Sequence, residues 1–300
     1  MVHPHRGTIF LEDAEILSNE AFAGDQFVLR IHAPKLAAAA EPGTFAHIRC
    51  DQMLPMRRPM SVMRTDVRAG WAEFLYKRVG EGTRLLATAE RGQSLSVLGP
   101  IGVPFSLSAS SRRPLLIGGG VGIPPMVFLS DRLRQAGSDR MPLVLMGSEV
   151  PFPFTPRPSQ IMLPHVPPGV IACMPLLEDW GIPSRLASQQ GFAGCYDGYV
   201  TDLARIWIDS LPADDRMEVE IFACGPTPML KATQTLAASF GLKSQLCLEE
   251  YMACAVGGCA GCAVRIRTAE GPAMKRVCVD GPVFAGESVV FEPVEAGDGV

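Results

Sequence analysis

The stretch CAVGGCAGC, residues 254–262, places three cysteines in a short glycine-rich segment, and a fourth, Cys278, follows after fifteen further residues. Cys254, Cys259 and Cys262 have the spacing C-x4-C-x2-C, which with a distant fourth cysteine is the plant-type pattern for a 2Fe–2S cluster. The intervening glycines let the backbone approach a cluster closely and adopt positive φ. We therefore predict that these four cysteines are the ligands of a 2Fe–2S cluster.

A zinc site or two disulfides would also use four cysteines. Structural zinc sites usually pair their cysteines as two C-x2-C units, which this spacing does not match. Disulfides persist in oxidising compartments, and the first residues, MVHPHRG, lack the apolar core of a signal peptide. The five other cysteines have no motif spacing, so we expect reduced thiols in a cytoplasmic protein.

The composition is that of an ordinary globular protein. A chain of 300 residues, 47% hydrophobic and 19% charged, has enough core material for two or three domains. The net charge of −4 argues against a nucleic-acid partner. No run of 18 uncharged apolar residues occurs, so we expect no membrane span.

Residues 8–110 are mostly typical of β-structure. Apolar and polar side chains alternate over 26–32, 44–49 and 71–76, and Pro-Gly or Ala-Gly pairs separate these segments. Short strands at such intervals predict a small antiparallel β-barrel. One short helix is expected over 82–87, and the serine-rich segment 106–113 is expected to be a linker.

Two stretches of this barrel have features suited to phosphate. The first is RRPMSV, residues 57–62, in which Arg58 precedes a strand and can pair with a pyrophosphate, while the hydroxyl of Ser61 could reach a flavin ring. The second is LYK, residues 75–77, followed by GEGT, in which Thr83 is expected to be the N-cap of a helix whose N-terminus favours an anion. A solvated arginine and ordinary helix capping are the alternatives, but the two features together favour a nucleotide cofactor.

Residues 113–238 alternate between strands and helices. Apolar strands over 113–118 and 218–224 each lead into a turn, GGGVGIPP or GPTP, and then into a helix over 126–135 or 229–238. Further strands are expected over 142–147 and 170–174, a helix over 203–209, and a proline-rich loop between residues 151 and 170. This alternation predicts a parallel sheet covered on both faces, with its ligand at the carboxyl ends of the strands. Such turns can also bind nothing, but two on one sheet edge favour a nicotinamide dinucleotide.

The motifs RRPMSV, LYK with GEGT, GGGVGIPPM, CGPTPML and the four cysteines follow one another in this order. In that order they resemble the ferredoxin–NADP reductase superfamily with a C-terminal cluster, and most of all the electron-transfer subunits of class 1B dihydroorotate dehydrogenases. The resemblance extends from about residue 8 to residue 292. It implies an FAD-binding antiparallel β-barrel (1–108), a doubly wound parallel α/β nicotinamide-nucleotide domain (109–243) and a small 2Fe–2S cluster domain (244–300).

The resemblance also implies roles for individual residues. Those that would hold FAD are Arg58, Pro59, Met60, Ser61, Leu75, Tyr76, Lys77, Gly82 and Thr83. Those that would face NAD(P) are Gly118, Gly119, Gly120, Val121, Gly122, Cys224, Gly225 and Pro226. The cluster ligands of the family correspond to Cys254, Cys259, Cys262 and Cys278. No catalytic acid or base is implied, and the histidines, His47 and His165 among them, are expected to be structural or surface groups.

Two departures from the family pattern concern the nucleotide. The family usually has Asp-Asp-Gly-Ser where this chain has SQQGF at residues 188–192. The change removes carboxylates that could accept from ribose hydroxyls or repel a 2′-phosphate, and Arg185 is close in sequence, so the choice between NAD and NADP is left open. The proline-rich segment 151–168 is also longer than the family pattern.

The expected function is electron transfer between NAD(P)(H), FAD and a 2Fe–2S cluster. The resemblance implies a partner, an FMN-containing catalytic subunit that oxidises dihydroorotate in pyrimidine biosynthesis. The flavin subunit of an NAD(P)H-dependent ferredoxin or sulfur-metabolism complex, or of an oxygenase reductase, is the alternative among enzymes. A non-catalytic redox sensor is a further alternative, but its signature would be a lost cysteine ligand or a broken Arg58-Pro-x-Ser61 motif, and neither is present.

Overall fold

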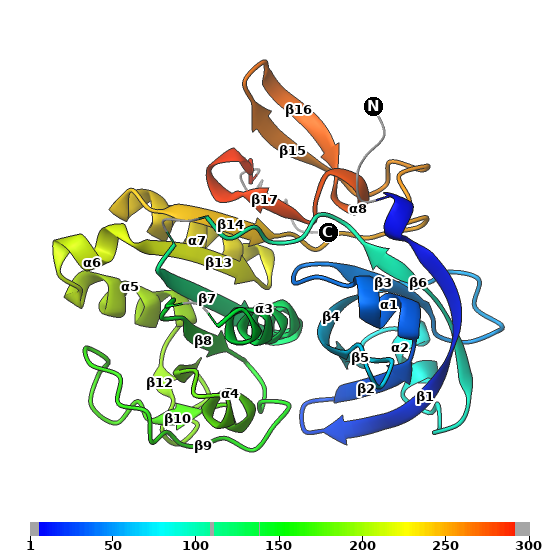
Figure 1. Cartoon of the computed structure of the whole chain (residues 1–300), viewed down its shortest axis with the longest axis horizontal. Helices are drawn as coiled ribbons and strands as arrows, with labels where there is room; N and C mark the ends of the chain where they lie inside the picture. Colours follow the sequence, from blue (N-terminus) through cyan, green and yellow to red (C-terminus); the bar gives the residue numbers. More distant parts are fainter. Residues whose placement is uncertain (1–5, 109–110, 138, 292–300) are drawn as a thin grey trace, which may run out of the picture.

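The computed structural model describes residues 6–108, 111–137 and 139–291 (Figure 1). Its first part is a closed barrel of six antiparallel strands in the order β1-β2-β5-β4-β3-β6. The predicted antiparallel barrel is therefore confirmed. The elements of this part are η1 (Arg6–Thr8), β1 (Phe10–Phe22), β2 (Gln26–His32), α1 (Pro34–Ala39), β3 (Phe45–Arg49), β4 (Arg58–Asp66), β5 (Trp71–Lys77), α2 (Glu81–Leu86) and β6 (Ser94–Ile101).

The barrel closes around a core built by the alternation of its strands. Every second side chain points inward, and Ile16, Leu29 and Phe74 are fully buried there. The opposite face of β3 and β6 packs on the rest of the molecule, since Phe45 and Ile101 belong to the core of the second sheet. The barrel thus packs directly against the second domain on this face.

The second part is a seven-stranded sheet in the order β12-β11-β8-β7-β13-β14-β17, parallel except for the antiparallel edge strand β17. The predicted parallel α/β domain is confirmed in its fold. The strands of the sheet are β7 (Arg113–Gly119), β8 (Leu143–Gly147), β11 (Ser184–Ser188), β12 (Tyr196–Asp197), β13 (Val219–Cys224), β14 (Lys243–Cys247) and β17 (Val283–Ala285). Between them lie η2 (Gly120–Gly122), α3 (Ile123–Gln135), β9 (Arg157–Pro158), β10 (Ala172–Cys173), α4 (Pro175–Asp179), α5 (Val200–Ser210), α6 (Ala213–Met217) and α7 (Thr227–Phe240).

Helices cover both faces of this sheet because its strands are apolar on both sides. Leu115 and Ile117 of β7 pack with α5 and α7, whereas Leu116 between them packs with α3. In sequence β7 comes first, β8 and β11 are added on one side of it, and β13 is added on the other. The carboxyl ends of β7 and β13 therefore form the point at which the strand order reverses, where doubly wound sheets bind their ligands.

The C-terminal part carries the cysteine motif and a hairpin that projects from the molecule (Figure 1, orange). Its elements are β15 (Ala263–Thr268), β16 (Gly271–Arg276), α8 (Val277–Asp280) and η3 (Gly286–Ser288). β14 spans the predicted domain boundary at 243/244, and β17 returns to the large sheet. The domain boundaries stay a prediction. No helix in the described ranges is long and apolar enough to cross a membrane.

Candidate functional site

The four cysteines of the motif lie together as two pairs. The backbone N–H of Cys259 donates to the Sγ of Cys254 at 3.4 Å, and the Sγ atoms of Cys262 and Cys278 are 3.3 Å apart. The second pair is buried, whereas Cys259 is exposed. A 2Fe–2S cluster takes two thiolates on each iron, so two pairs of thiols fit its donor set. Among the described residues, no group of three or more His, Cys, Asp or Glu side chains is placed so that it could hold a single metal ion.

The local sequence explains how the pairs form. Gly257 adopts a φ of 79°, and Ala255 and Ala260 also have positive φ, so the chain coils tightly between the ligands. The hairpin β15–β16 then turns the chain back, and its register places Ala263 opposite Arg276. Because these residues flank Cys262 and Cys278, the hairpin brings two ligands that are distant in sequence together.

The surroundings of the two pairs differ electrostatically. Burial raises the pKa of Cys254, but backbone N–H groups of Val256, Cys259 and Gly258 outweigh it and lower that pKa to about 7. Burial and the neighbouring Cys262 raise the pKa of Cys278 to about 12. Iron binds the thiolate form and displaces the proton. Cys254 therefore gives up its proton more readily than Cys278, whose deprotonation depends on the bound metal.

The two predicted FAD motifs meet at Arg58 and Gly82. A β-carbon on Gly82 would lie 3.1 Å from the Nε and 3.2 Å from the Cζ of Arg58, so the guanidinium lies flat against the first turn of α2. Arg58 donates to the carbonyl of Met56 at 2.9 Å and, within the described residues, forms no ion pair. A guanidinium without a carboxylate partner, held against a glycine, is suited to a phosphate.

The neighbouring Arg57 has a different role. Its Nη1 donates to the carbonyl of Ser96 at 2.6 Å and to that of His47 at 3.3 Å. These bonds tie β3 to β6 and occupy the guanidinium. Of the two adjacent arginines, Arg58 is therefore the one that is turned toward Gly82.

The prediction that Thr83 is the N-cap of α2 is wrong. The N-cap is Gly80, and Thr83 is the third residue of the helix. Its Oγ1 accepts from the backbone N–H groups of Val79 at 3.0 Å and Gly80 at 3.2 Å. The hydroxyl folds back on the preceding turn, so Thr83 orders the approach to the helix instead of starting it.

The other predicted FAD residues divide by orientation. Met60 and Tyr76 belong to the barrel core, and the hydroxyl of Tyr76 donates to Asn19 at 3.0 Å. Burial raises the pKa of Tyr76 to about 12. Such residues can offer a cofactor only their backbone. Ser61 and Lys77 are partly exposed, Pro59 is exposed, and Leu75 is buried against the second domain.

The two glycine turns come together at the carboxyl ends of β7 and β13. Gly118 is the register partner of Cys224. A β-carbon on Gly119 would lie 2.6 Å from the Sδ of Met229, and one on Gly225 would lie 3.2 Å from the Cα of Gly119. The two turns therefore approach each other closely, the side chain of Met229 packs against both glycines, and α3 begins directly behind the first turn. Val121 is partly exposed and Pro226 exposed on the same edge.

The side chain of Cys224 faces away from this edge. It is fully buried in the core that also contains Cys247, its register partner on β14. The contact with Cys247 and the burial raise the pKa of Cys224 far above its ordinary value. The thiol stays protonated and the carbonyl of Cys224 lies against Gly122, so a contact of Cys224 with the nucleotide stays a prediction.

Arg185 is close in sequence to SQQGF, but its guanidinium is not available to a 2′-phosphate. It is 4% exposed, and burial lowers its pKa. Its guanidinium donates to the carbonyls of Val170 at 3.0 Å, Ser184 at 2.7 Å and Ile161 at 2.9 Å. Arg185 therefore fixes the proline-rich segment in place.

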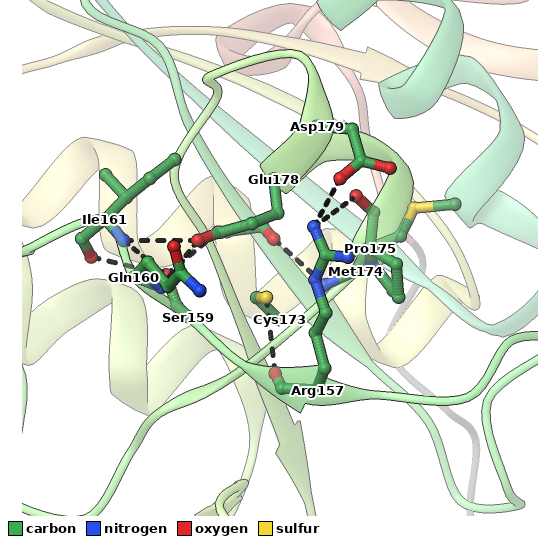
Figure 2. A network of polar contacts seen from close by, with 10 residues as sticks. Arg157, Ser159, Gln160, Ile161, Cys173, Met174, Pro175, Glu178 and Asp179 are labelled. Carbon is green, nitrogen blue, oxygen red and sulfur yellow. Dashed lines mark hydrogen bonds and ion pairs between the residues drawn. The ribbon is translucent and has the colours of Figure 1, made fainter.

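A second set of contacts, not anticipated from the sequence, fixes the same segment (Figure 2). The carboxylate of Glu178 on α4 accepts from the hydroxyl of Ser159 at 2.9 Å and from the backbone N–H groups of Gln160 at 2.6 Å and Ile161 at 3.2 Å. Burial raises the pKa of Glu178, but these hydrogen bonds outweigh it and the net shift is downward. Arg157 pairs with Asp179 beside them. The segment is thus a fixed part of the domain, although no periodicity in the sequence predicts it.

Comparison with known proteins gives one consistent result. The family model for the iron–sulfur cluster binding domain of dihydroorotate dehydrogenase B matches residues 249–290. The dihydroorotate dehydrogenase B (NAD(+)) electron transfer subunit of Shouchella clausii is 30% identical over 281 residues, 92% of this chain and 96% of that one. The corresponding subunit of Geobacillus kaustophilus is 32% identical over 287 residues, 93% and 98% of the two chains.

Solved structures agree on the fold. The structure of an NADH-dependent reduced ferredoxin-NADP oxidoreductase superimposes with a TM-score of 0.73 at 27% identity, over 92% of this chain and 89% of that one. The ferredoxin reductase of carbazole 1,9a-dioxygenase superimposes with a TM-score of 0.60 at 22% identity, over 78% and 67% of the two chains. The second likeness supports the barrel and sheet architecture alone.

Proposed function

The chain belongs to the family of dihydroorotate dehydrogenase B electron transfer subunits, and from this premise we propose which of its residues carry electrons between a nicotinamide nucleotide, FAD, a 2Fe–2S cluster and a catalytic partner subunit. The observation that carries the proposal is the arrangement of the four motif cysteines as two pairs. The second pair, Cys262 and Cys278, has its Sγ atoms 3.3 Å apart. When bound, the flavin takes up a hydride from the nicotinamide and exchanges single electrons with the cluster.

The chain's own contribution is binding and orientation. Arg58 would bind the pyrophosphate of FAD from its position against Gly82, and the partly exposed Ser61 would offer its hydroxyl to the flavin. The turns around Gly119 and Gly225, at the carboxyl ends of β7 and β13, would hold the nicotinamide nucleotide, because the sheet reverses its strand order there. Cys254, Cys259, Cys262 and Cys278 hold the cluster, and Gly261 donates its N–H to the Sγ of Cys259 at 3.4 Å. Such N–H donors tune the potential of a cluster.

The proposed partner is an FMN-containing catalytic subunit that oxidises dihydroorotate for pyrimidine biosynthesis. Within its described ranges this chain has a single closed barrel, which we assign to FAD. The FMN-containing barrel must therefore belong to a partner subunit. We place the protein in the cytoplasm, because none of its nine cysteines forms a disulfide.

A second candidate partner is a ferredoxin-type flavoprotein complex. The specific observation in its favour is the likeness to the NADH-dependent ferredoxin-NADP oxidoreductase, at a TM-score of 0.73. The two candidates use the same nicotinamide, FAD and cluster sites and differ only in where the electrons go.

Native co-purification separates the two candidates. The protein is isolated from its own cells, its partner is identified by mass, and the complex is assayed for dihydroorotate-dependent reduction of NAD. Co-purification with an FMN-containing barrel subunit and activity in this assay are the expected results. A large iron–sulfur flavoprotein as partner, with no response to dihydroorotate, would replace the first candidate by the second.

A further inference from the structure

His47 lies on β3, on the outer face of the barrel. Its neighbours Ala46 and Ile48 point into the barrel core, whereas Phe45, on the same face as His47, packs against the second domain. His47 is nevertheless only 1% exposed. Another part of the chain must therefore cover it.

The covering segment leads into the cluster loop. The backbone of Met252, two residues before Cys254, interacts with the imidazole of His47. Met252 and Leu98, the register partner of His47 on β6, both pack against the core that contains Cys262 and Cys278. On its other side His47 is the register partner of Pro59, which is part of the RPMS motif. The ring thus lies between the motif proposed for FAD and the segment that starts the cluster loop.

The imidazole is polar, buried and without a full set of partners. Neither Nδ1 nor Nε2 has a hydrogen-bond partner among the described residues, although the backbones of Arg57 and Met252 are near enough to favour a proton on the ring. Burial, reinforced by the charge of Arg57, lowers the pKa of His47 to about 4. The ring is therefore neutral at pH 7, with one N–H donor and one acceptor. An apolar side chain would fill this place without the cost of burying unpaired nitrogens.

We propose that His47 is a positioning residue for electron transfer between the flavin and the cluster. Its buried ring packs between β3 and the segment at Met252 and so keeps the start of the cluster loop at a fixed separation from the FAD motif. One electron leaves the reduced flavin and enters the oxidised cluster, and His47 itself neither gains nor loses an electron or a proton. Its effect is on the rate, because electron transfer slows as the two cofactors move apart. The inference rests on the proposed function, in particular on the proposed FAD and cluster residues.

The test follows the two redox steps separately in the complete protein with both cofactors bound. NADH is mixed with the protein in a stopped-flow spectrometer, and flavin reduction and the later cluster reduction are recorded at their own wavelengths. His47→Leu should retain FAD and iron and keep the rate of flavin reduction, while cluster reduction slows by at least about tenfold. His47→Gln keeps a donor and an acceptor of similar reach and should restore most of that rate.

Gln26→Leu is the matched control. Gln26 is also a buried polar residue of the barrel, but it donates to the carbonyl of Pro151 in the nucleotide-binding domain at 2.6 Å. Its loss should leave the rate of cluster reduction unchanged. A His47→Leu protein that reduces its cluster at the wild-type rate would overturn the inference, as would a His47→Gln protein that is no faster than His47→Leu.

A measurement on the wild type keeps the inference testable if His47→Leu does not fold. A crystal structure of the loaded protein should show the imidazole of His47 packed against the backbone at Met252, and a ring turned away from Met252 toward the barrel would contradict the inference. Failure of the proposed function would give another result in the stopped-flow test. The wild type itself would then not reduce its cluster with NADH.

Discussion

Gly122 lies directly against the carbonyl group of Cys224, and a β-carbon at Gly122 would overlap both atoms of that carbonyl. The contact joins two turns that are about a hundred residues apart in the sequence. It is made by backbone on both sides, so it depends on the absence of a side chain. The edge of the sheet at which we propose that the nucleotide binds is therefore shaped by the mutual approach of these turns.

Gly122→Ala should weaken nicotinamide binding. The added methyl group must push α3 away from β13, and the KM for NADH should rise by at least about tenfold. FAD and iron content are measured in the same preparations, because β4 and β5, which carry the proposed FAD residues, pack against α3 and η2. Gly7→Ala is the control, since Gly7 has open space around it and no positive φ. A Gly122→Ala protein with the wild-type KM would show that this edge of the sheet does not bind the nucleotide.

Cys262→Ser should remove the cluster and leave the flavin reaction. Serine is a poor substitute for a thiolate ligand, and Cys262 is the buried partner of Cys278. The variant should lose the visible absorption and most of the iron, while it still oxidises NADH with artificial acceptors. Cys195→Ser changes a cysteine outside the motif and should keep the full cluster. Normal iron content in Cys262→Ser would refute the ligand assignment.

Arg58→Ala should loosen FAD. The loss of a charge-assisted bond to phosphate costs about 1.5–3 kcal/mol, which raises the Kd for FAD by about 10- to 150-fold. FAD retained after dilution and gel filtration gives the measurement. Arg68→Ala removes an exposed arginine from the turn after β4 and is the control. Equal FAD retention by the two variants would argue against a pyrophosphate at Arg58.

The barrel, the parallel sheet and the set of four motif cysteines could be predicted from the sequence, because periodicity and spacing are local signals, whereas the pairing of the cysteines could not. Thr83 could not be placed, since Ser or Thr near a helix start can bond forward into the helix or back into the preceding turn. The packing of Arg58 on Gly82 joins two motifs that the sequence separates, and only the barrel closure brings them together.

The burial of His47 and Arg185 by segments distant in sequence could not be predicted either. His47 is a strand residue on an outward face, and nothing nearby in sequence indicates that the segment at Met252 covers it. The burial of Arg185 is equally hard to predict. One of its three carbonyl partners is Ile161, which belongs to a proline-rich segment without periodicity. The sequence neighbours of these two side chains do not reveal their burial, because tertiary contacts set their environment.

Arg185→Gln should lower stability and leave coenzyme preference unchanged. The guanidinium is buried and donates to three carbonyls, so its removal leaves buried acceptors unpaired, at a cost of about 1–3 kcal/mol. The ratio of kcat/KM for NADH and NADPH should remain that of the wild type, while the Tm falls. Gln190→Arg, which adds a cation to the exposed SQQGF loop, is the contrasting variant and should shift that ratio toward NADPH. A shift in Arg185→Gln would mean that its guanidinium reaches the nucleotide.

The buried ring of His47 should make the protein sensitive to acid. Its pKa is lowered from 6.5 to about 4 in the folded protein. Between these values the unfolded chain binds a proton that the folded chain does not, so stability falls as the pH drops from 6.5 toward 4 and is fully retained above 6.5. The loss amounts to about 3 kcal/mol at most. In His47→Gln this contribution is absent.

The measurement is urea unfolding of the wild type and His47→Gln in parallel at several pH values across this interval. Loss of cofactors in acid affects both proteins and cancels in their difference. That difference should move by up to about 3 kcal/mol in favour of the variant as the pH falls from 7 to 4. His47→Leu should follow the same course, because the effect comes from the loss of a titrating ring. Parallel curves for wild type and both variants would show that His47 is not held neutral by its burial between β3 and Met252.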